Sequence, residues 1–489
     1  MTEQDEAAVG LSRSFSLRKC IILLIIAAIT TVVWNLPSAS FGIEGLTAVQ
    51  QRIIAIFVFA TLAWLTEPIP AWGTSIVIIA LMCLTVSEHG LLPFKGEDVG
   101  QLLKAKDIMG TFADPVIILF LGGFILAIAA SKSGLDVVLA RYLILPFGNK
   151  SQNTLLGFLL ITGFFSMFVS NTATAAMMLA FLAPLFAALP ANGNARTALI
   201  LAVPVGANIG GMGTPIGTPP NAIVMKVLND PDGMNMGLGF GDWMLIMFPL
   251  TIVILLIAWR MILHLYPMKD VTVKLDIKGE MQKSWRMWVV VATFIITVLL
   301  WMIPSEYTGL DANVIALIPI SVFTLTGVIT ASDLGKIDWS VIWMVAGGFA
   351  LGVGLNNTGL ADAAIKSLPF GAWSPLAILL ISGLICFVLS NFISNTATVA
   401  LLAPFIAVVC TGMGDKLDVI GGTPTVLIGI ALAASAAMSL PISTPPNAIA
   451  YATGLVDMKN MFRVGLNIGI ISMILSYIVL YFAAMAGLI

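Results

Sequence analysis

The chain has 489 residues, of which 59% are hydrophobic and only 10% are charged, and its mean hydropathy is +1.03. Soluble domains carry about 25% charged residues, so this composition excludes an ordinary soluble domain and indicates that lipid is the solvent. The formal net charge of −2 argues against a nucleic-acid partner, which would select a basic face. Four dispersed cysteines and two histidines give no metal-binding or redox spacing.

Apolar stretches in the sequence predict membrane-spanning helices, each of which needs about 20 mostly apolar residues. Eleven stretches meet or approach that length. They fall near residues 19–36, 50–66, 71–87, 115–131, 195–209, 241–266, 285–303, 311–329, 338–356, 423–438 and 461–487. The sequence therefore predicts an all-α polytopic membrane protein with eleven transmembrane helices.

Two further apolar blocks, 152–189 and 373–411, are each interrupted by the polar string SNTAT. The arms on either side hold roughly 15–18 residues, or about 22–27 Å of helix, which falls short of a hydrocarbon core of about 30 Å. Each block is therefore interpreted as a re-entrant helical hairpin whose tip lies inside the membrane. The alternative is a pair of ordinary helices joined by a polar turn at the surface.

Basic residues predict the orientation. Arg13, Arg18 and Lys19 precede the first helix, and the loop 266–286 carries five more lysines and arginines. The positive-inside rule places both segments in the cytoplasm, which puts Ile489 outside after eleven spans. The predicted outer loop 88–114 also contains three lysines, which speaks against this orientation.

Self-similarity is the strongest signal in the sequence. The segment 122–135 resembles 347–360 at an offset of 225, SNTAT recurs at an offset of 224, and GTPPNAI recurs as STPPNAI at an offset of 226. Three motifs in the same order and at nearly one offset indicate a duplicated unit of about five helices. An odd number of predicted spans separates the copies, so they form inverted repeats, an arrangement typical of secondary transporters.

The repeated motifs offer groups that suit an anion and a cation together. Ser, Asn and Thr at a hairpin tip present neutral donors and oxygens, and the helix that follows presents free N–H groups to an anion. The paired prolines of TPPN break a helix and expose backbone carbonyls. The alternatives are that SNT merely caps a helix and that TPPN marks a kinked packing helix.

Both motifs lack ionisable side chains, so an anionic substrate would meet no fixed side-chain cation. Two or more bound Na⁺ ions would supply the charge, whereas a proton-coupled carrier would more often show an intramembrane carboxylate or histidine at the site. Glu67, Asp114 and Asp136 lie near helix ends and are interpreted as structural or interfacial.

The paired SNT and TPPN segments, with TEPIP at 66–70, resemble the divalent anion/Na⁺ symporter family, which includes sodium–dicarboxylate and sodium–citrate carriers. The resemblance covers the chain from about residue 20. It implies eleven membrane helices, two re-entrant hairpins, a homodimer, and an elevator-type movement of a transport region against a scaffold.

The resemblance also implies site residues. The substrate-binding set is Ser170, Asn171, Thr172, Thr218, Pro219, Ser394, Asn395, Thr396, Thr444 and Pro445. The first sodium site would use Ser166, Ser170, Asn171 and the Gly217 carbonyl, and the second would use Ser390, Ser394, Asn395 and the Ser443 carbonyl. Family members that exchange anions without sodium can carry a basic residue at a cation site, and none stands at these positions.

These assignments divide the chain into six parts. Residues 1–18 form a cytoplasmic tail, 19–131 and 285–356 the scaffold helices, 132–266 and 357–489 the transport regions with their hairpins, and 267–284 a cytoplasmic linker.

The predicted function is Na⁺-driven import of a C4-dicarboxylate such as succinate, malate or fumarate across a bacterial inner membrane. Alternatives within transport are a symporter of citrate, sulfate or another divalent anion, and a dicarboxylate exchanger. A membrane-embedded enzyme would need a nucleophile–base pair or a metal cluster, and none is visible in the sequence. A passive channel is a third class, which a flux assay would distinguish by leak that is independent of any gradient.

Overall fold

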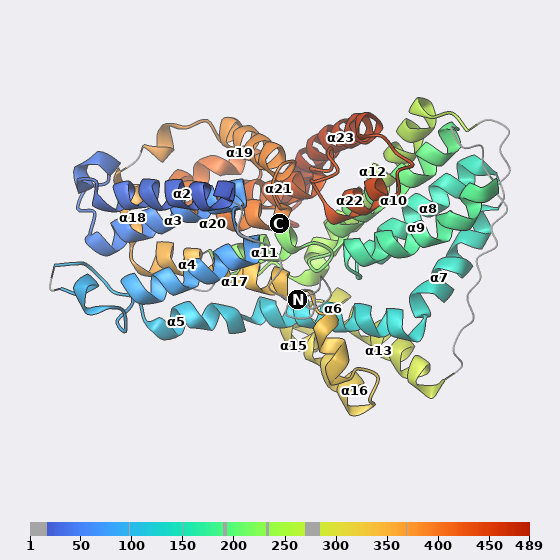
Figure 1. Ribbon diagram of the computed structural model, residues 1–489, viewed down its shortest axis with the longest axis horizontal. Coiled ribbons are helices and arrows are strands. Elements are labelled where there is room, and N and C mark those ends of the chain that lie inside the picture. Colours follow the sequence, from blue (N-terminus) through green and yellow to red (C-terminus); the bar gives the residue numbers. More distant parts are fainter. Residues whose placement is uncertain are drawn as a thin grey trace, which may run out of the picture.

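The computed structural model describes residues 17–489 except 97, 149, 189–192, 231–233, 269–283 and 368. Every regular element in these residues is a helix, and an isolated bridge joins Ser87 to Leu103. The expected all-α fold is thus confirmed for the described part of the chain (Figure 1). Most of the predicted cytoplasmic tail 1–18 and linker 267–284 lies outside the described residues.

The longer helices follow the predicted stretches closely. They are α2 (Leu17–Asn35), α3 (Ala48–Thr66), α4 (Ala71–Thr85), α6 (Pro115–Ser133), α7 (Leu135–Ile144), α8 (Ser151–Ser166), α9 (Asn171–Ala188), α10 (Asn194–Gly210), α11 (Pro219–Leu228), α12 (Phe240–Leu265), α13 (Trp285–Met302), α16 (Leu317–Leu325), α17 (Trp339–Asn357), α19 (Pro375–Ser390), α20 (Asn395–Met413), α21 (Gly422–Ala436), α22 (Pro445–Ala452) and α23 (Met458–Met485). Shorter helices, among them α5 (Ala105–Gly110), α15 (Ala312–Ile315), α18 (Leu360–Ser367), η5 (Gly211–Gly213) and η8 (Gly414–Ile420), lie between them.

Nine helical segments of the described chain are long and apolar enough to cross a membrane. Eight of them coincide with predicted spans, and the ninth is 395–420, which contains α20. The predicted spans 71–87, 311–329 and 423–438 form shorter apolar helices instead. The count of eleven spans therefore stays a prediction.

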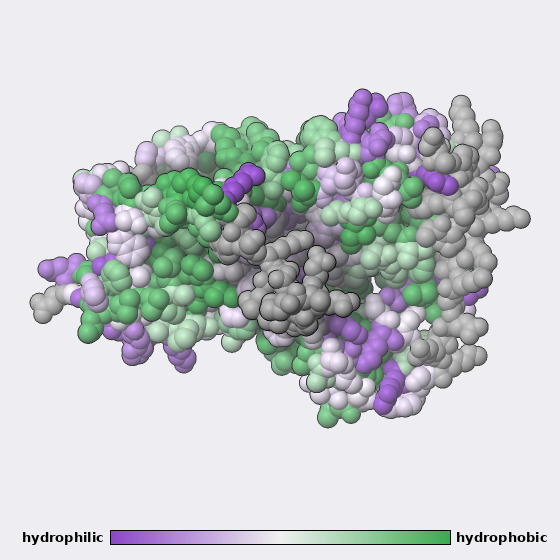
Figure 2. All heavy atoms as spheres, in the orientation of Figure 1, coloured by the Kyte–Doolittle hydropathy of each residue, from purple (hydrophilic) through white to green (hydrophobic). Residues whose placement is uncertain are grey.

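The outer surface of α2 has the composition expected of a helix in lipid. Leu24 is 70% exposed and Val32 is 61% exposed, and only Ile26 of this helix is buried. Figure 2 shows apolar side chains gathered over the face formed by α2, α3 and α4. An uncovered apolar surface of this kind is stable where acyl chains replace water.

Each SNTAT block folds as two helices joined by a short turn, α8 with α9 and α19 with α20. Three arms contain 16, 18 and 16 residues, as the hairpin interpretation expects. The fourth arm, α20, has 19 residues and continues into η8, so the expectation that all four arms are short is wrong for this arm.

Two broken helices form the centre of the molecule. α10 and α21 are buried along nearly their whole length, and each ends in a loop from which a second, shorter helix restarts, α11 and α22 respectively. A helix that is apolar on all sides is stable either in lipid or enclosed by other helices. Here α8, α9 and α12 pack around α10, and α19, α20 and α23 pack around α21.

Equivalent elements recur along the chain. α17, α19 and α20 start 224 residues after α6, α8 and α9, and α22 starts 226 residues after α11. The duplicated motifs thus lie on duplicated elements, and each half supplies one SNT turn and one TPPN break to the centre of the molecule.

Candidate functional site

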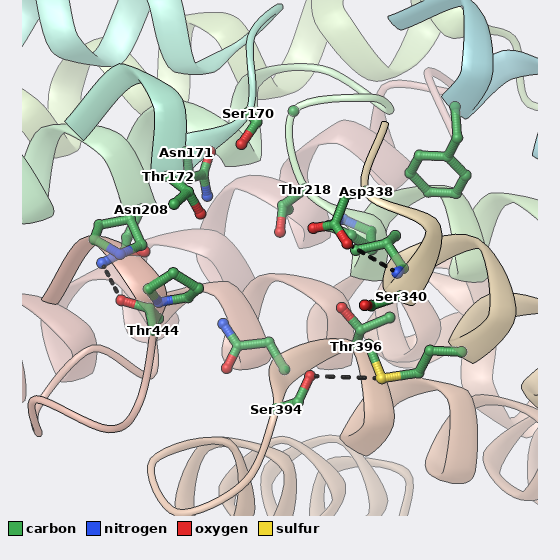
Figure 3. A pocket seen from close by; sticks show the side chains of 18 of the residues that line it. Ser170, Asn171, Thr172, Asn208, Thr218, Asp338, Ser340, Ser394, Thr396 and Thr444 are labelled. Atoms are coloured by element: carbon green, nitrogen blue, oxygen red, sulfur yellow. Dashed lines mark hydrogen bonds between the residues drawn. The ribbon is translucent and has the colours of Figure 1, made fainter. Parts of the chain in front are cut away.

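A cavity of about 580 Å³ lies where the two SNT turns and the two TPPN breaks converge (Figure 3). All ten side chains predicted to bind substrate line it, and of the additional predicted sodium ligands Gly217 and Ser443 line it as well. Ser166 and Ser390 are fully buried in the last turn of α8 and α19, five residues before the asparagines. The structure therefore brings together residues more than 200 positions apart in the sequence.

The SNT turns place helix N-termini at the cavity. Asn171 is the first residue of α9 and Asn395 is the first residue of α20. The first backbone N–H groups of a helix have no partner within it and carry partial positive charge, so both turns favour a bound anion. In the first copy Ser170 Oγ accepts from Ala173 N at 3.4 Å, which supports a helix-capping role there. In the second copy the Ser394 side chain makes no capping bond.

The TPPN breaks share one geometry. Thr218 and Thr444 are extended residues, and a proline follows each at the first position of the new helix. In the first copy Asn221 Nδ2 donates to the carbonyls of Gly211 and Thr214 at 3.0 and 2.9 Å.

The second copy repeats this arrangement. Asn447 Nδ2 donates to the carbonyls of Met438 and Leu440 at 2.7 and 3.0 Å. The motif asparagines thus satisfy buried loop carbonyls, which α-helical bonds no longer reach. This role was missed in the sequence, although the asparagine stands in both copies of the motif.

The oxygen atoms around the second turn fit a cation. Ser390 Oγ and Asn395 Oδ1 are both buried and have no hydrogen-bond partner among the described residues. The Ser443 hydroxyl is engaged, since it donates to the Asn391 carbonyl at 3.0 Å and accepts from Leu440 N at 2.9 Å. Buried oxygens without partners are costly unless a ligand satisfies them, and hard cations such as Na⁺ prefer oxygen ligands.

The oxygen atoms around the first SNT turn are related to those around the second but are not arranged identically. Ser166 Oγ contacts Asn171 Oδ1 and lies 2.8 Å from the carbonyl of Ala207, to which it donates. A Cβ atom added to Gly211 would lie 3.0 Å from the Asn171 side-chain amide and 3.1 Å from the Gly217 carbonyl oxygen. A side chain at this position would crowd these oxygens, which fits the close backbone approach that the glycine-rich first copy predicts.

The rest of the cavity lining comes from other helices, and most of its residues belong to no repeated motif in the sequence. Trp72, Phe124, Asp338 and Met344 belong to this part of the lining, and so does Glu67, which the sequence predicts to be structural or interfacial. Met344 lies against the second SNT turn, since Ser394 Oγ is 3.8 Å from its sulfur atom. No lysine, arginine or histidine is present among the described lining residues. Asp338 is the N-cap of α17, and a capping aspartate marks the start of a helix but not which space it faces.

The other two acidic residues near helix ends have structural contacts. Asp114 caps α6 through Val116 N and pairs with Lys226 of α11 at 3.2 Å. Asp136 is buried, accepting from Ser131 Oγ and from Val137 N at 2.7 Å each. Neither residue lines the cavity at the SNT turns.

Comparisons with solved structures support the fold. The YdaH transporter of Alcanivorax borkumensis has a TM-score of 0.53 at 15% identity, over 89% of this chain and 98% of that one. MtrF of Neisseria gonorrhoeae, whose structure is described as illuminating a class of antimetabolite efflux pumps, has a TM-score of 0.51 at 15% identity, over 84% and 94%. Both likenesses support an all-helical membrane fold with several spans for this chain.

Sequence comparison is more specific. The profile of the family described as citrate transporter matches residues 61–420. The sodium-dependent dicarboxylate transporter SdcS of Staphylococcus saprophyticus is 30% identical over 472 residues, covering 88% of this chain and 85% of that protein. The protein of the same name from Staphylococcus aureus strain USA300 is 31% identical over 470 residues, with the same coverage. The chain belongs to the divalent anion/Na⁺ symporter family, and the resemblance seen in its motifs is confirmed.

Proposed function

We propose that this protein imports C4-dicarboxylates such as succinate, malate and fumarate, driven by the sodium gradient across the bacterial inner membrane. The observation that carries the proposal is the cavity itself. Ten neutral donors and wall residues from both SNT turns and both TPPN breaks surround one space, and the described lining contains no basic side chain.

Charge balance explains why sodium belongs in this proposal. A dianion in this cavity meets two helix N-termini, each equivalent to roughly half a positive charge, and the carboxylates of Glu67 and Asp338 also line the space. Bound sodium at the Asn171 and Asn395 turns would supply the missing positive charge beside the substrate. Substrate affinity would then depend on sodium concentration by linkage.

The movement we propose is of the elevator type. The regions 132–266 and 357–489 would carry the cavity-lining motifs across the membrane against the scaffold regions 19–131 and 285–356. The scaffold would hold two copies of the chain together as a homodimer, with the N-terminus in the cytoplasm and the C-terminus outside. Light scattering in mild detergent tests the dimer, and a monomer would contradict it.

The test of function is uptake by purified protein in liposomes. An inward Na⁺ gradient should drive concentrative uptake of radiolabelled succinate, and replacing Na⁺ with choline under a pH gradient should abolish it. Equal uptake in choline would exclude sodium coupling. Efflux that requires an external dicarboxylate but not Na⁺ would identify an exchanger instead.

Citrate is the alternative substrate, because the matching family profile is described as citrate transporter. The cavity volume of about 580 Å³ accommodates either anion, so volume does not discriminate between them. Competition of unlabelled succinate, citrate and sulfate against labelled succinate ranks the three directly.

A further inference from the structure

A chain of hydrogen bonds connects the interior of the second TPPN break to the cavity through Asn208. This residue lies near the end of α10, in the first half of the chain, and is 2% exposed. Its Nδ2 atom lies 3.1 Å from Asn447 Oδ1 and 3.1 Å from Thr444 Oγ1. Figure 3 shows Asn208 directed at Thr444 across the boundary between the two halves.

The direction of every bond in this chain is fixed by the backbone. The carbonyls of Met438 and Leu440 can only accept, so the Asn447 side chain must turn its Nδ2 toward them. Its Oδ1 then faces Asn208, which must present its own Nδ2 in return. The second hydrogen of that amide is left for Thr444 Oγ1.

Thr444 therefore receives donors on both sides of its oxygen. Its Oγ1 accepts from Asn208 Nδ2 at 3.1 Å and from Asn447 N at 3.4 Å. A hydroxyl has two acceptor lone pairs and one donor hydrogen, so both lone pairs are occupied. No acceptor for the hydroxyl hydrogen is found among the described residues, and Thr444 lines the cavity.

We infer that Asn208 is a positioning residue that makes Thr444 an obligate hydrogen-bond donor to an anionic group of the substrate. This inference rests on the proposed function, since it assumes an anion in the cavity. A carboxylate offers only acceptors, so a hydroxyl that can only donate binds it well. A ligand with a donor group at the same position would find no acceptor there.

The first half of the chain provides an internal comparison. At the repeat offset of 226, Ala434 stands where Asn208 would have its counterpart. Thr218 correspondingly makes no side-chain capping bond, and Asn221 Oδ1 is buried without a partner in the described structure. The fixed donor is thus a property of one side of the cavity, and substrate recognition is asymmetric although the motifs are duplicated.

The test is a double-mutant cycle on succinate affinity, measured with radiolabelled succinate on purified protein in saturating Na⁺. Asn208→Ala and Thr444→Val should each weaken binding about tenfold, equivalent to about 1.4 kcal/mol. The double variant should bind no more weakly than Thr444→Val alone, because both changes remove the same bond. A double variant weakened about a hundredfold would show that Asn208 acts independently of Thr444, and would overturn the inference.

Two controls separate positioning from general damage. In the double variant Thr218→Val with Asn208→Ala, the fold losses of succinate affinity of the two single variants should multiply, because Thr218 has no bond to Asn208. Half-saturation by Na⁺ without succinate should match wild type in Asn208→Ala, whereas a residue needed only for folding would shift it. If Asn208→Ala does not fold, Asn208→Asp is the second variant: its carboxylate accepts the Thr444 hydrogen, so binding should again weaken at least tenfold.

The outcomes also separate this inference from the proposed function. Wild-type protein that binds none of succinate, citrate and sulfate in Na⁺ overturns both. Wild-type protein that binds succinate, with Asn208→Ala unchanged in affinity, overturns the role of Asn208 alone.

Discussion

Replacing Asn395 with alanine removes a side chain that makes no hydrogen bond to any described residue, with Oδ1 fully enclosed. In the absence of Na⁺ the change should therefore leave thermal stability nearly unaltered, unlike the loss of a helix cap, which costs about 0.5–2 kcal/mol. In Na⁺ the change removes a proposed cation ligand and should weaken sodium binding about tenfold or more.

The size of the effect follows from ligand linkage. At a Na⁺ concentration one hundred times the dissociation constant, bound sodium stabilises the folded protein by about 2.7 kcal/mol, and a tenfold weaker site retains about 1.4 kcal/mol. Melting temperatures of wild type and Asn395→Ala, each measured in NaCl and in choline chloride, give this difference. Succinate uptake should fall at least tenfold in the same variant.

Asn171→Ala is the matched variant from the other half of the chain. It should lose sodium stabilisation and uptake to a similar degree, and also about 0.5–1.5 kcal/mol in choline, because Asn171 Oδ1 already contacts Ser166 Oγ. The reasoning is refuted if Asn395→Ala keeps wild-type stabilisation by Na⁺ and wild-type uptake. A large loss of stability in choline would instead assign Asn395 to helix capping.

Three more substitutions test other contacts. Gly211→Ala would place a methyl group 3.0 Å from the Asn171 amide, so the Na⁺ concentration for half-maximal uptake should rise several-fold in a sodium titration. Lys226→Ala removes the ion pair between α11 and Asp114, the N-cap of α6. Loss of about 1 kcal/mol should shift the equilibrium between positions of α11 relative to α6 about fivefold. The distribution of distances between spin labels on these two helices should then broaden, and an unchanged distribution would speak against movement there. Lys132 and Lys336 hold the pKa of Asp333 well below its usual value near 4. The ionised carboxylate therefore stabilises the fold at neutral pH, and this stabilisation is lost as the pH falls into the acid range. Asp333→Asn should lower the melting temperature at pH 7, and the decrease of the melting temperature between pH 5 and 3 should become smaller.

The helices and the cavity residues were predictable for different reasons. Apolar length located α2, α3, α6 and α12 within a few residues, because a span in lipid must satisfy all its backbone bonds internally. The duplicated motifs predicted which polar residues converge, since polar groups that interrupt apolar helices are stable only where they line a shared polar space. Both signals are local patterns that a single sequence displays.

Contacts between the halves left no such pattern. Asn208 and Thr444 are 236 positions apart, and nothing in the string NIGG distinguishes a buried asparagine that donates across the molecule from one that caps its own helix. Asp338 was missed for the same reason, because facing a cavity depends on how distant helices pack. Arm length misled in a different way, because α20 runs two residues past the predicted end at residue 411 and the 3-10 helix η8 then continues it.

Differences between the repeats carry information that the shared motifs cannot. Identical motifs give both halves the same turn and break, which alone would make the two sides of the cavity equivalent. Asn208 has alanine at its counterpart, and so does Lys226, whose counterpart is Ala452. The first difference fixes a hydroxyl donor on one side of the cavity, and the second adds an ion pair between α11 and α6. Unmatched polar residues are therefore where the two sides of the cavity differ in their contacts, whereas the duplicated residues give both sides the same ones.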